Sequence, residues 1–495
     1  MRSTVYHSPV YNRERIQAWE KRWFEQHNSS LGLMQQVAWS IAERLDQYIL
    51  KNSLSIRKIA VWCGSGNNAG DGYYTAAYLT QKGYEVQIFA APMGDSLDLK
   101  QAVLYAQTNK INIESNFSVP DHFDGHIDAL FGIGLNRELD QKWQGIIQHF
   151  NQLSGLKIAI DVPSGLNANT GQVLPIAIKA DITFTALAIK MGLVTGQAKE
   201  YVGQLEVISS IPHDNELKPI AYLTSPDIYL PKRQAFGHKG SYGHVLVVGG
   251  HANMGGAVIM AAEAAFHAGA GKVTVMCDAS HHSAILSRSP NIMLQDIDQF
   301  DQAKIEELLT QIDAVCFGMG LGRDNKSVQI FQRWFEILKN QTQLEIVLDA
   351  DALWFLAEEK NTDLHENIYL TPHSAEAARL LDTTVQQVEQ DRVAAIDQLQ
   401  KKYQGNWVLK GSGSLILEND ELFVCSTGNA GMGTGGMGDV LAGMIASLKA
   451  QFHTEIALSD IVTLHGKAGD LLARKGQRGI QAQHMADAIY QVVNI

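Results

Sequence analysis

The sequence predicts an α/β protein with two doubly wound domains, each built around a parallel sheet. Apolar runs that suit buried strands alternate with glycine turns and helices, which is the order of a sheet covered on both faces. The pattern stops once, at residues 211–231, where four prolines indicate a linker, and then restarts. A chain of 495 residues also exceeds one ordinary hydrophobic core.

The first half opens with an amphipathic helix that Ser29 or Ser30 caps. Residues 63–72 then predict a glycine turn, and residues 73–82 predict a helix. Strands are expected at the apolar runs 56–62, 85–90, 127–131, 157–160 and 181–188. Several of these strands run into polar residues. Because parallel strands end at one edge of a sheet, we expect a ligand site at that edge.

The second half repeats this organisation without a residue-by-residue repeat. A strand enters the glycine turn at Gly249, a small-residue helix covers 257–268, and two helices close the chain near 464–474 and 485–492. Further strands are expected at 272–277, 313–317, 345–348, 368–370 and 407–409. Each of the last four leads into glycine, Asp, His or Lys, so a second ligand site is expected.

Composition excludes several classes of partner. The net charge is −12 and no block of Lys or Arg occurs, which argues against nucleic acid and anionic membrane. No apolar run reaches membrane-spanning length, and the first ten residues lack an apolar core. The four cysteines are far apart, without metal-ligand spacing. We therefore expect buried thiols in a reducing cytoplasm.

Residues 431–443 carry the strongest chemical signal. Five glycines and Thr434 precede Asp439, and apolar residues then recur at helical spacing, so Asp439 is expected at a helix start. Glycine N–H groups and a helix N-terminus form an anion site. An aspartate kept ionised there suits a base for a hydroxyl that attacks a phosphoryl group. The alternative is a flexible glycine loop with an N-capping Asp.

Other segments of the second half support this interpretation only in combination. Lys410-Gly-Ser-Gly-Ser414 follows a strand and could hold nucleotide phosphates, although it lacks the P-loop order and could be a tight turn. His373 could be an ordinary loop histidine, and the glycines of 318–322 could serve a close-packed turn. Asp349-Ala-Asp351 follows another strand.

In this order, together with residues 240–244 and 465–470, these segments resemble the ribokinase-like NAD(P)H-hydrate dehydratases. The first half resembles the partner epimerase, of the YjeF N-terminal, Rossmann-like type, through residues 66–72, 128–135, 161–165 and 190–196. The resemblance covers nearly the whole chain and is similar to the fused bacterial repair enzyme, an isomerase and a lyase in one chain. It implies an epimerase domain at 1–222 and a dehydratase domain at 223–495.

For the epimerase, the resemblance implies Asp161 as general acid and base. It implies K⁺ on Asn68, Asp128 and Ser164, which offer amide, carboxylate and hydroxyl oxygens. A buried, hydrogen-bonded carboxylate is the alternative role for Asp128. The implied substrate-binding residues are Asn67, Asn68, Ala69, Gly70, Asp71, Gly132, Ile133, Gly134, Leu135, Asn136, Arg137, Glu138 and Asp161.

For the dehydratase, the resemblance implies Asp439 as the base, Mg²⁺ for the phosphoryl step and either ADP or ATP as co-substrate. The hydrate of NADH or NADPH would contact Ala257, Gly320, His373 and Asp439. The adenine nucleotide would contact Lys410, Gly411, Ser412, Gly413, Ser414 and Gly438. We expect these small molecules as partners and a homo-oligomeric assembly.

The chain departs from the family pattern at Ala69, Met319, Ser374-Ala375 and Ser414, where the family usually has Gly, Pro, Pro-Gly and Thr. Ala69 matters most, because its Cβ requires negative φ or narrows the approach of the backbone to a ligand. Two alternative functions are a ribokinase-like kinase for a vitamin precursor and a first half that acts only as a scaffold. A stable phosphorylated product would indicate the kinase.

Overall fold

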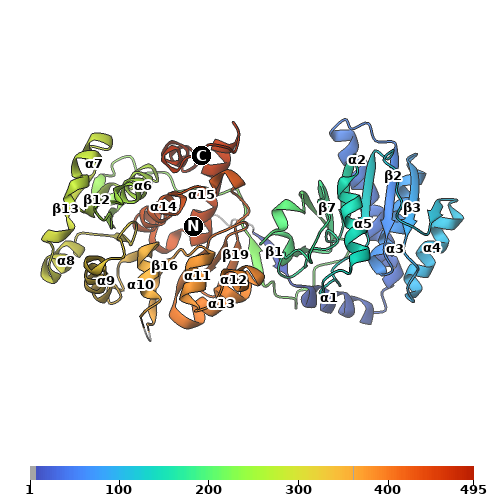
Figure 1. The fold of residues 1–495 in the computed structure, drawn as a ribbon, viewed down its shortest axis with the longest axis horizontal. Helices are drawn as coiled ribbons and strands as arrows, with labels where there is room; N and C mark the ends of the chain where they lie inside the picture. Colours follow the sequence, from blue (N-terminus) through green and yellow to red (C-terminus); the bar gives the residue numbers. More distant parts are fainter. Residues whose placement is uncertain (1–6, 360–361, 495) are drawn as a thin grey trace. The chain divides into compact units, whose positions relative to one another are not determined.

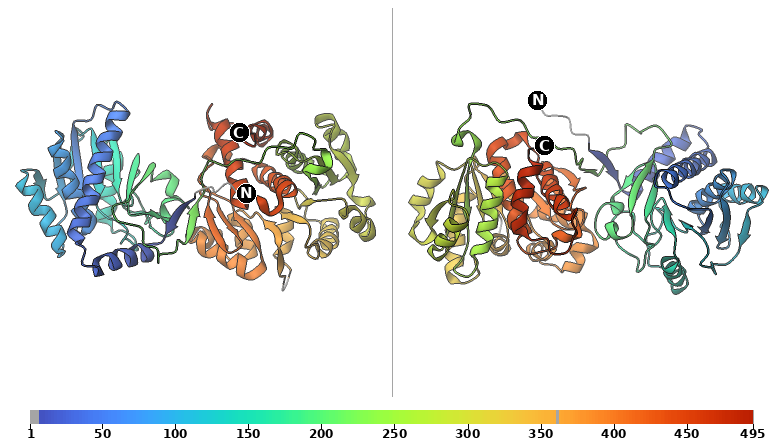
Figure 2. Two further views of the ribbon diagram at one scale, coloured as in Figure 1. Left: turned by 180° about the vertical axis from the view of Figure 1, so that it is seen from behind. Right: turned by 90° about the horizontal axis from the view of Figure 1, so that it is seen from above.

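The computed structural model describes residues 7–359 and 362–494, which form two compact units (Figure 1). The N-terminal unit comprises residues 9–221, and the C-terminal unit comprises residues 222–494 with residues 7 and 8. Each unit has its own sheet, with helices on both faces (Figures 1 and 2). This confirms the predicted doubly wound α/β class.

The N-terminal sheet has the strand order β4-β3-β2-β5-β6-β7-β9, and all its pairs are parallel. The chain winds outward from β2 in one direction and from β5 in the other, so the order reverses between these two strands. A ligand site is expected at the carboxyl ends of the strands there. The strands span Lys58–Cys63 (β2), Glu85–Ala90 (β3), Asn112–Glu114 (β4), Gly125–Ala129 (β5), Leu156–Ile160 (β6), Ile182–Ala186 (β7) and Gln204–Ile208 (β9).

Alternating side chains of β2 explain why helices cover both faces of this sheet. Ile59, Val61 and Cys63 pack in the cluster that includes α2 (Ser30–Lys51), α3 (Asn67–Gln81) and α4 (Leu97–Thr108). Ala60 and Trp62 pack on the other face with Ile147 and Phe150 of α5 (Gln141–Gln152). A strand buried on both faces is apolar throughout, which is why its sequence was recognisable.

A smaller layer precedes this sheet in the chain. Strand β1 (Ser8–Tyr11) pairs in parallel with β8 (Ile189–Lys190), and α1 (Arg13–Glu25) follows directly. Asn12 caps α1 by accepting a hydrogen bond from the Arg15 N–H, and Ile16 and Trp19 are buried in the core. Helix α1 was not among the helices expected from the sequence.

The C-terminal sheet has the order β13-β12-β11-β14-β15-β16-β17-β18-β19-β10. Its pairs are parallel except those of β18 with β17 and β19, and the winding reverses between β11 and β14. The strands span Ala221–Leu223 (β10), His244–Val248 (β11), Lys272–Cys277 (β12), Met293–Asp296 (β13), Ala314–Phe317 (β14), Glu345–Leu348 (β15), Leu364–Leu370 (β16), Gln404–Leu409 (β17), Leu415–Glu418 (β18) and Glu421–Val424 (β19).

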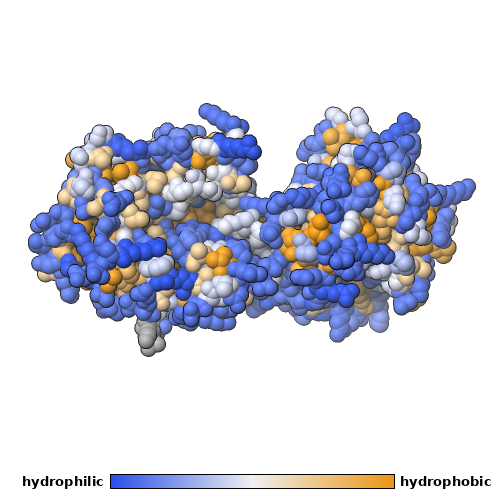
Figure 3. All heavy atoms as spheres, in the orientation of Figure 1, coloured by the Kyte–Doolittle hydropathy of each residue, from blue (hydrophilic) through white to orange (hydrophobic). Residues whose placement is uncertain are grey.

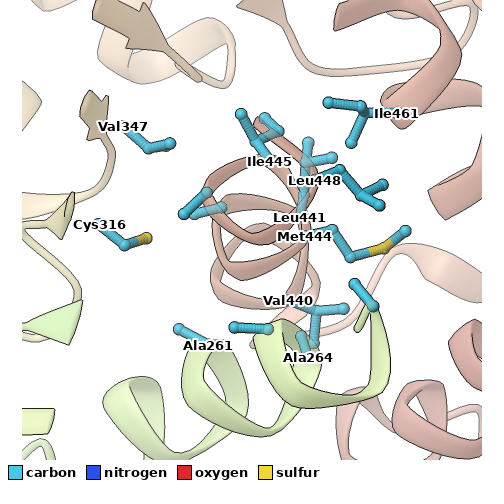
Figure 4. Packing of buried hydrophobic residues seen from close by; sticks show 14 of the residues in the cluster. Ala261, Ala264, Cys316, Val347, Val440, Leu441, Met444, Ile445, Leu448 and Ile461 are labelled. Carbon is cyan, nitrogen blue, oxygen red and sulfur yellow. The ribbon is translucent and has the colours of Figure 1, made fainter. Parts of the chain in front are cut away.

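Helices α6 (Gly255–His267) and α14 (Met437–Phe452) cover one face of this sheet. Figure 4 shows side chains of α14 between Cys316 and Val347 of the strands and the small residues of α6. The two helices approach closely because a Cβ at Gly443 would lie 2.0 Å from the Ala261 carbonyl oxygen. On the other face, Phe317 stacks on Phe331 of α9 (Asn325–Leu338).

The remaining helices of the C-terminal unit lie around this core. They span His282–Arg288 (α7), Gln302–Leu309 (α8), Asp351–Leu356 (α10), Ser374–Leu380 (α11), Val385–Gln390 (α12), Arg392–Tyr403 (α13), Leu458–Ala473 (α15) and Met485–Val492 (α16). Hydrophilic residues cover most of the face of each unit seen in Figure 3. All four cysteines are buried and free, as predicted. Within the described ranges, no helix has the length and apolar composition needed to cross a bilayer.

One prediction about local structure was wrong, and the linker prediction, although the two units do divide at residues 221 and 222, missed a strand. Residues 67–72 form the first turns of α3 and not a glycine turn. Their glycines serve close packing, because a Cβ at Gly72 would lie 2.5 Å from the Ala129 Cβ, and one at Gly70 would lie 2.5 Å from the Met34 sulfur. The predicted linker at 211–231 also contains β10, which pairs in parallel with β19.

Candidate functional sites

A pocket of about 740 Å³ opens at the carboxyl ends of β2, β5 and β6, where the winding of the N-terminal sheet reverses. The predicted residues Asn67, Asn68, Asp71, Asp161 and those from Gly132 to Glu138 all line it. Ala69 and Gly70 do not, because they lie buried in α3. Ala69 has a helical backbone, in which φ is negative, and it does not line the pocket. Its Cβ therefore neither strains the backbone nor narrows the approach to a ligand.

Asp161 follows β6 with a left-handed backbone, φ 68°, which turns its carboxylate into the pocket. Lys190 Nζ donates to Asp161 Oδ1 at 2.6 Å, and the Ile133 N–H donates to Oδ2 at 3.0 Å. Lys190 is itself buried and also donates to Thr185 Oγ1. This arrangement holds an ionised carboxylate in a fixed orientation. Lys190 belongs to the segment 190–196, which resembles the epimerase, but it was not predicted as a site residue.

Gly132 lets two polar side chains converge. A Cβ at this position would lie 3.0 Å from Asn68 Oδ1 and 3.1 Å from Asp161 Oδ2. The Asn68 Nδ2 atom is buried and has no hydrogen-bond partner among the described residues. A buried amide without a partner is costly, so Asn68 is suited to bind a group that enters the pocket.

Asp128 and Ser164 form a buried pair and do not line the pocket. The Ser164 N–H donates to Asp128 Oδ2 at 2.7 Å, and the Ser164 hydroxyl donates to Oδ1 at 2.6 Å. Burial raises the pKa of Asp128 to about 6, although the hydrogen bonds from Ser164 and Leu130 oppose this shift. Asp128 is therefore a buried carboxylate that is held by hydrogen bonds. The oxygen atoms of Asp128 and Ser164 are also suitable ligands for a cation, and together they carry a single negative charge.

Glu20 of α1 and Asp71 of α3 add two carboxyl groups to the same pocket. Burial raises the pKa of Asp71 well above its ordinary value, and the charges of Asp161 and Glu20 add to the shift. Burial and Asp161 likewise raise the pKa of Glu20, while Lys190 opposes. Sequence reasoning missed Glu20, because nothing in a charged helix marks which acid faces a pocket.

In the C-terminal unit, a lysine and several carboxylates meet at the carboxyl ends of β15, β16 and β17. Lys410 Nζ donates to Asp349 Oδ1 at 2.9 Å and lies 3.9 Å from Glu376 Oε2. Burial opposes the charge of Lys410, yet Asp349 and Glu376 hold its pKa above the ordinary value. Asp349 and Glu376 were not among the predicted site residues, although Asp349 directly follows a strand that the sequence predicts.

Asp439 lies in the first turn of α14, as predicted. Gly436 caps this helix in the left-handed region, φ 91°, where a Cβ would lie 2.4 Å from the Met260 sulfur. Burial raises the pKa of Asp439 to about 7, Asp349 adds to this shift, and Lys410 opposes it. The helix start therefore does not hold the pKa of Asp439 low, because burial outweighs it. A pKa near 7 still suits a general base.

The predicted nucleotide-binding residues Lys410 and Gly438 lie together. A Cβ at Gly438 would be 3.0 Å from Lys410 Nζ, so glycine allows the amine to lie against the start of α14. Gly411 and Gly413 both have positive φ. The Ser414 hydroxyl donates to the Gly411 carbonyl at 3.0 Å, which closes a tight turn over Gly411, Ser412 and Gly413. Buried Arg392 fixes this turn through the carbonyls of Leu409 and Lys410.

The predicted hydrate-binding residues fall into two groups. Gly320, which follows β14, has φ 58°, and a Cβ there would lie 3.3 Å from the Ala257 Cβ in the first turn of α6, so these two residues are neighbours. His373 caps α11 by accepting hydrogen bonds from the Ala375 and Glu376 N–H groups. Burial and Lys410 lower the pKa of His373. His373 thus has a structural role as a helix cap.

Each unit carries a lysine among carboxylates at the carboxyl edge of a doubly wound sheet, which is the arrangement of a two-domain enzyme. A family profile described as YjeF-related protein N-terminus matches residues 30–192, and one described as NAD(P)H-hydrate dehydratase matches residues 245–491.

The bifunctional NAD(P)H-hydrate repair enzyme Nnr of Vibrio cholerae is 39% identical over 439 residues, covering 86% of this chain and 86% of that protein. The enzyme of the same name from Coxiella burnetii is 39% identical over 454 residues, covering 88% and 90%. The chain therefore belongs to the bifunctional NAD(P)H-hydrate repair enzymes.

Two solved structures each match about half of the chain. A ribokinase-like superfamily protein from Enterococcus faecalis is 30% identical, with a TM-score of 0.48, over 53% of this chain and 92% of that one. The ADP/ATP-dependent NAD(P)H-hydrate dehydratase of Bacillus subtilis, co-crystallised with ATP and Mg²⁺, is 26% identical with a TM-score of 0.47, over 53% and 93%.

Proposed function

We propose that this chain repairs hydrated NADH and NADPH in two steps. Residues 1–222 interconvert the R and S epimers of the hydrate, and residues 223–495 dehydrate the S epimer at the expense of ADP or ATP. Hydration leaves a hydroxyl on the carbon beside the ring nitrogen, as either epimer. Membership of a family named for this repair and a separate lysine–carboxylate site in each unit support the proposal.

Asp161 would act as general acid and base in the epimerase. Its ion pair with Lys190 and its hydrogen bond from the Ile133 N–H hold the carboxylate toward the pocket. An ionised carboxylate in this position can accept a proton from the hydroxyl of the hydrate or from a water molecule. Residues Asn67, Asn68 and those from Gly132 to Glu138 would surround the substrate.

Asn68, Asp128 and Ser164 fit K⁺. They supply amide, carboxylate and hydroxyl oxygens with one negative charge, which suits a hard monovalent ion better than a divalent one. When bound, the ion would supply positive charge near the hydroxyl of the hydrate. The direct bond between Asp128 and Ser164 keeps two of these groups together.

The single observation that carries the dehydratase half is Asp439 at the start of α14, beside Lys410. Asp439 would take the proton from the hydroxyl group of the hydrate. The hydroxyl oxygen would attack the terminal phosphoryl group, and the bond from phosphorus to the nucleotide would break. The carbon–oxygen bond then breaks, phosphate leaves with the electron pair, and loss of a ring proton restores the double bond. The ring nitrogen assists this departure.

Lys410 and the glycine turn at 411–413 would hold the nucleotide phosphates, since an ammonium group and exposed backbone are the usual phosphate ligands. Mg²⁺ would neutralise charge on the transferring phosphoryl group. No cage of three or more His, Cys, Asp or Glu gathers for a metal in the described ranges. The phosphates with one or two carboxylates, such as Asp349 and Glu376, therefore fit the usual mode of Mg²⁺ binding.

The assembly and location of the protein complete the proposal. The chain would act in the cytoplasm as a homo-oligomer, on small molecules and without nucleic acid or membrane. Its net charge of −12 supports the last two statements. Substrate anions are then bound by local groups such as Lys410 and not by a general positive field.

The experiment that tests this function is incubation of purified protein with a mixed NADH hydrate and ADP or ATP. The proposal predicts that the absorbance of reduced nicotinamide returns almost completely. A phosphorylated hydrate that accumulates without this absorbance would instead indicate a kinase. No change in substrate would contradict both activities.

A further inference from the structure

Helix α1 contributes a wall of the epimerase pocket. Ile16, Gln17 and Glu20 line the pocket from this helix, facing Asp71 of α3 and Asp161 after β6. The matched family segment begins at residue 30, so α1 lies outside it. None of these three residues was predicted as part of a site.

The position of α1 is fixed at both ends. The Arg13 N–H donates to Asn169 Oδ1 at 2.7 Å, and Asn12 caps the first turn. At the other end, Arg22 forms an ion pair with Asp214 at 2.5 Å. Ile16 and Trp19 are buried on the side that faces the core. Glu20 therefore enters the pocket from an anchored helix.

Glu20 differs from Asp161 in its partners. Asp161 is paired with Lys190 at 2.6 Å, whereas the Glu20 carboxyl makes no hydrogen bond or ion pair within the described part of the chain. The charged groups that face Glu20 are Asp161 and Lys190, with Asp71 from α3. Burial and the charge of Asp161 raise the pKa of Glu20, which favours its protonated form. The pocket thus holds a carboxyl group that is unpaired among the described residues, that of Glu20, together with the carboxyl group of Asp161 that Lys190 binds.

Epimerisation through an iminium uses a proton donor and a proton acceptor. In this route one hydroxyl leaves from one face of the ring and another enters from the opposite face. The leaving oxygen needs a proton donor, and the entering water needs a proton acceptor. One carboxylate that is fixed by Lys190 cannot serve both oxygens at once.

We propose that Glu20 is a second catalytic residue of the epimerase, acting with Asp161; this inference rests on the proposed epimerase function. Glu20 donates its proton to the hydroxyl, the carbon–oxygen bond breaks, and water leaves as the ring nitrogen's lone pair forms a carbon–nitrogen double bond. A water molecule adds from the other face and gives a proton to Asp161. The reverse reaction exchanges the two roles, and solvent returns each carboxyl to its starting form.

The test compares Glu20→Gln with Glu25→Gln. Glu25 lies on the same helix with its side chain 61% exposed, so it controls for the loss of one charge from α1. Each variant receives mixed hydrate and nucleotide, so that the S epimer is dehydrated directly and the R epimer only after it epimerises. Glu20→Gln is expected to slow epimerisation by about 10²–10⁴, which adds a slow second phase, and to leave the dehydration of the S epimer unchanged. Glu25→Gln is expected to match the wild type, with a single phase.

A pH profile and a conservative variant separate catalysis from positioning. In the wild type, the epimerisation rate is expected to fall on the alkaline side as Glu20 loses its proton. Glu20→Gln should lose this limb, and Glu20→Asp should keep it and recover part of the rate. The inference is overturned if Glu20→Gln epimerises at more than a third of the wild-type rate. It is also overturned if the variant is slow but keeps the alkaline limb. A wild type that repairs the R epimer no faster than it epimerises spontaneously would contradict the epimerase itself.

Discussion

Asp439 is a buried carboxyl whose neighbours determine how it titrates. Replacing it by Asn keeps the size of the side chain and removes the base. We predict that Asp439→Asn lowers the rate of dehydration by about 10²–10⁴ and leaves epimerisation intact. Separate assays of hydrate epimer ratio and of restored absorbance would check this. Retention of more than about a tenth of the dehydration rate would show that another group is the base.

The charge of Asp349 affects how the rate of dehydration depends on pH. A base must be ionised, and the pKa of Asp439 is about 7, so dehydration should slow as the pH falls through 7. Asp349 raises this pKa, so Asp349→Asn should move the acid limb to lower pH. Asp487→Asn, with a side chain that is 93% exposed, is the control and should leave the limb in place. An unmoved limb in Asp349→Asn would contradict the assignment of the limb to Asp439.

At the scale of elements, the packing of α6 against α14 depends on glycine. A Cβ at Gly443 would lie 2.0 Å from the Ala261 carbonyl oxygen. We predict that Gly443→Ala lowers the free energy of unfolding by about 1–3 kcal/mol. At Gly145 in α5 a Cβ meets nothing within 4 Å, so Gly145→Ala should raise it by about 0.5–1 kcal/mol. Chemical denaturation measures both changes, and equal shifts would refute the close contact.

The strands were predictable because each buried strand is a short apolar run that ends in polar residues. Residues 272–277 and 345–348 coincide with β12 and β15. The start of α3 was not predictable in this way, because glycine favours a turn locally and only the contacts of Gly70 and Gly72 show that it serves packing. The charged helix α1 was missed for a related reason, since its buried face is narrow.

The candidate sites were predictable to a similar extent. Residues inside glycine-rich motifs, such as Asp161 and Asp439, lie where strand ends and helix starts were expected. Glu20 and Lys190 line the pocket with Asp161, and Asp349 pairs with Lys410 in the second site. Tertiary packing brings these three residues to their sites. The raised pKa of Asp439 was not predictable, because sequence shows the helix start and does not show how deeply the carboxyl is buried.

At the scale of the whole molecule, the two activities should respond separately to ions. We predict that replacing K⁺ by a bulky organic cation slows epimerisation and leaves the dehydration of the S epimer unchanged. The reason is that the proposed K⁺ ligands all lie in the N-terminal unit, namely Asn68, Asp128 and Ser164. Equal rates in both cations would contradict the K⁺ site. Loss of both activities would indicate a general effect of the cation on the protein.

The most direct measurement of a bifunctional chain is the time course of repair by Asp161→Asn with a mixed hydrate. A hydroxyl on the wrong ring face cannot reach both Asp439 and the phosphoryl donor, so the dehydratase should accept one epimer. The wild type should restore nearly all the cofactor in a single phase. Asp161→Asn should show a fast phase equal to the S fraction and a slow tail limited by spontaneous epimerisation. Complete repair by Asp161→Asn in one fast phase would contradict this account. If adding wild-type residues 1–222 then left the rate unchanged, the dehydratase would be shown to accept both epimers.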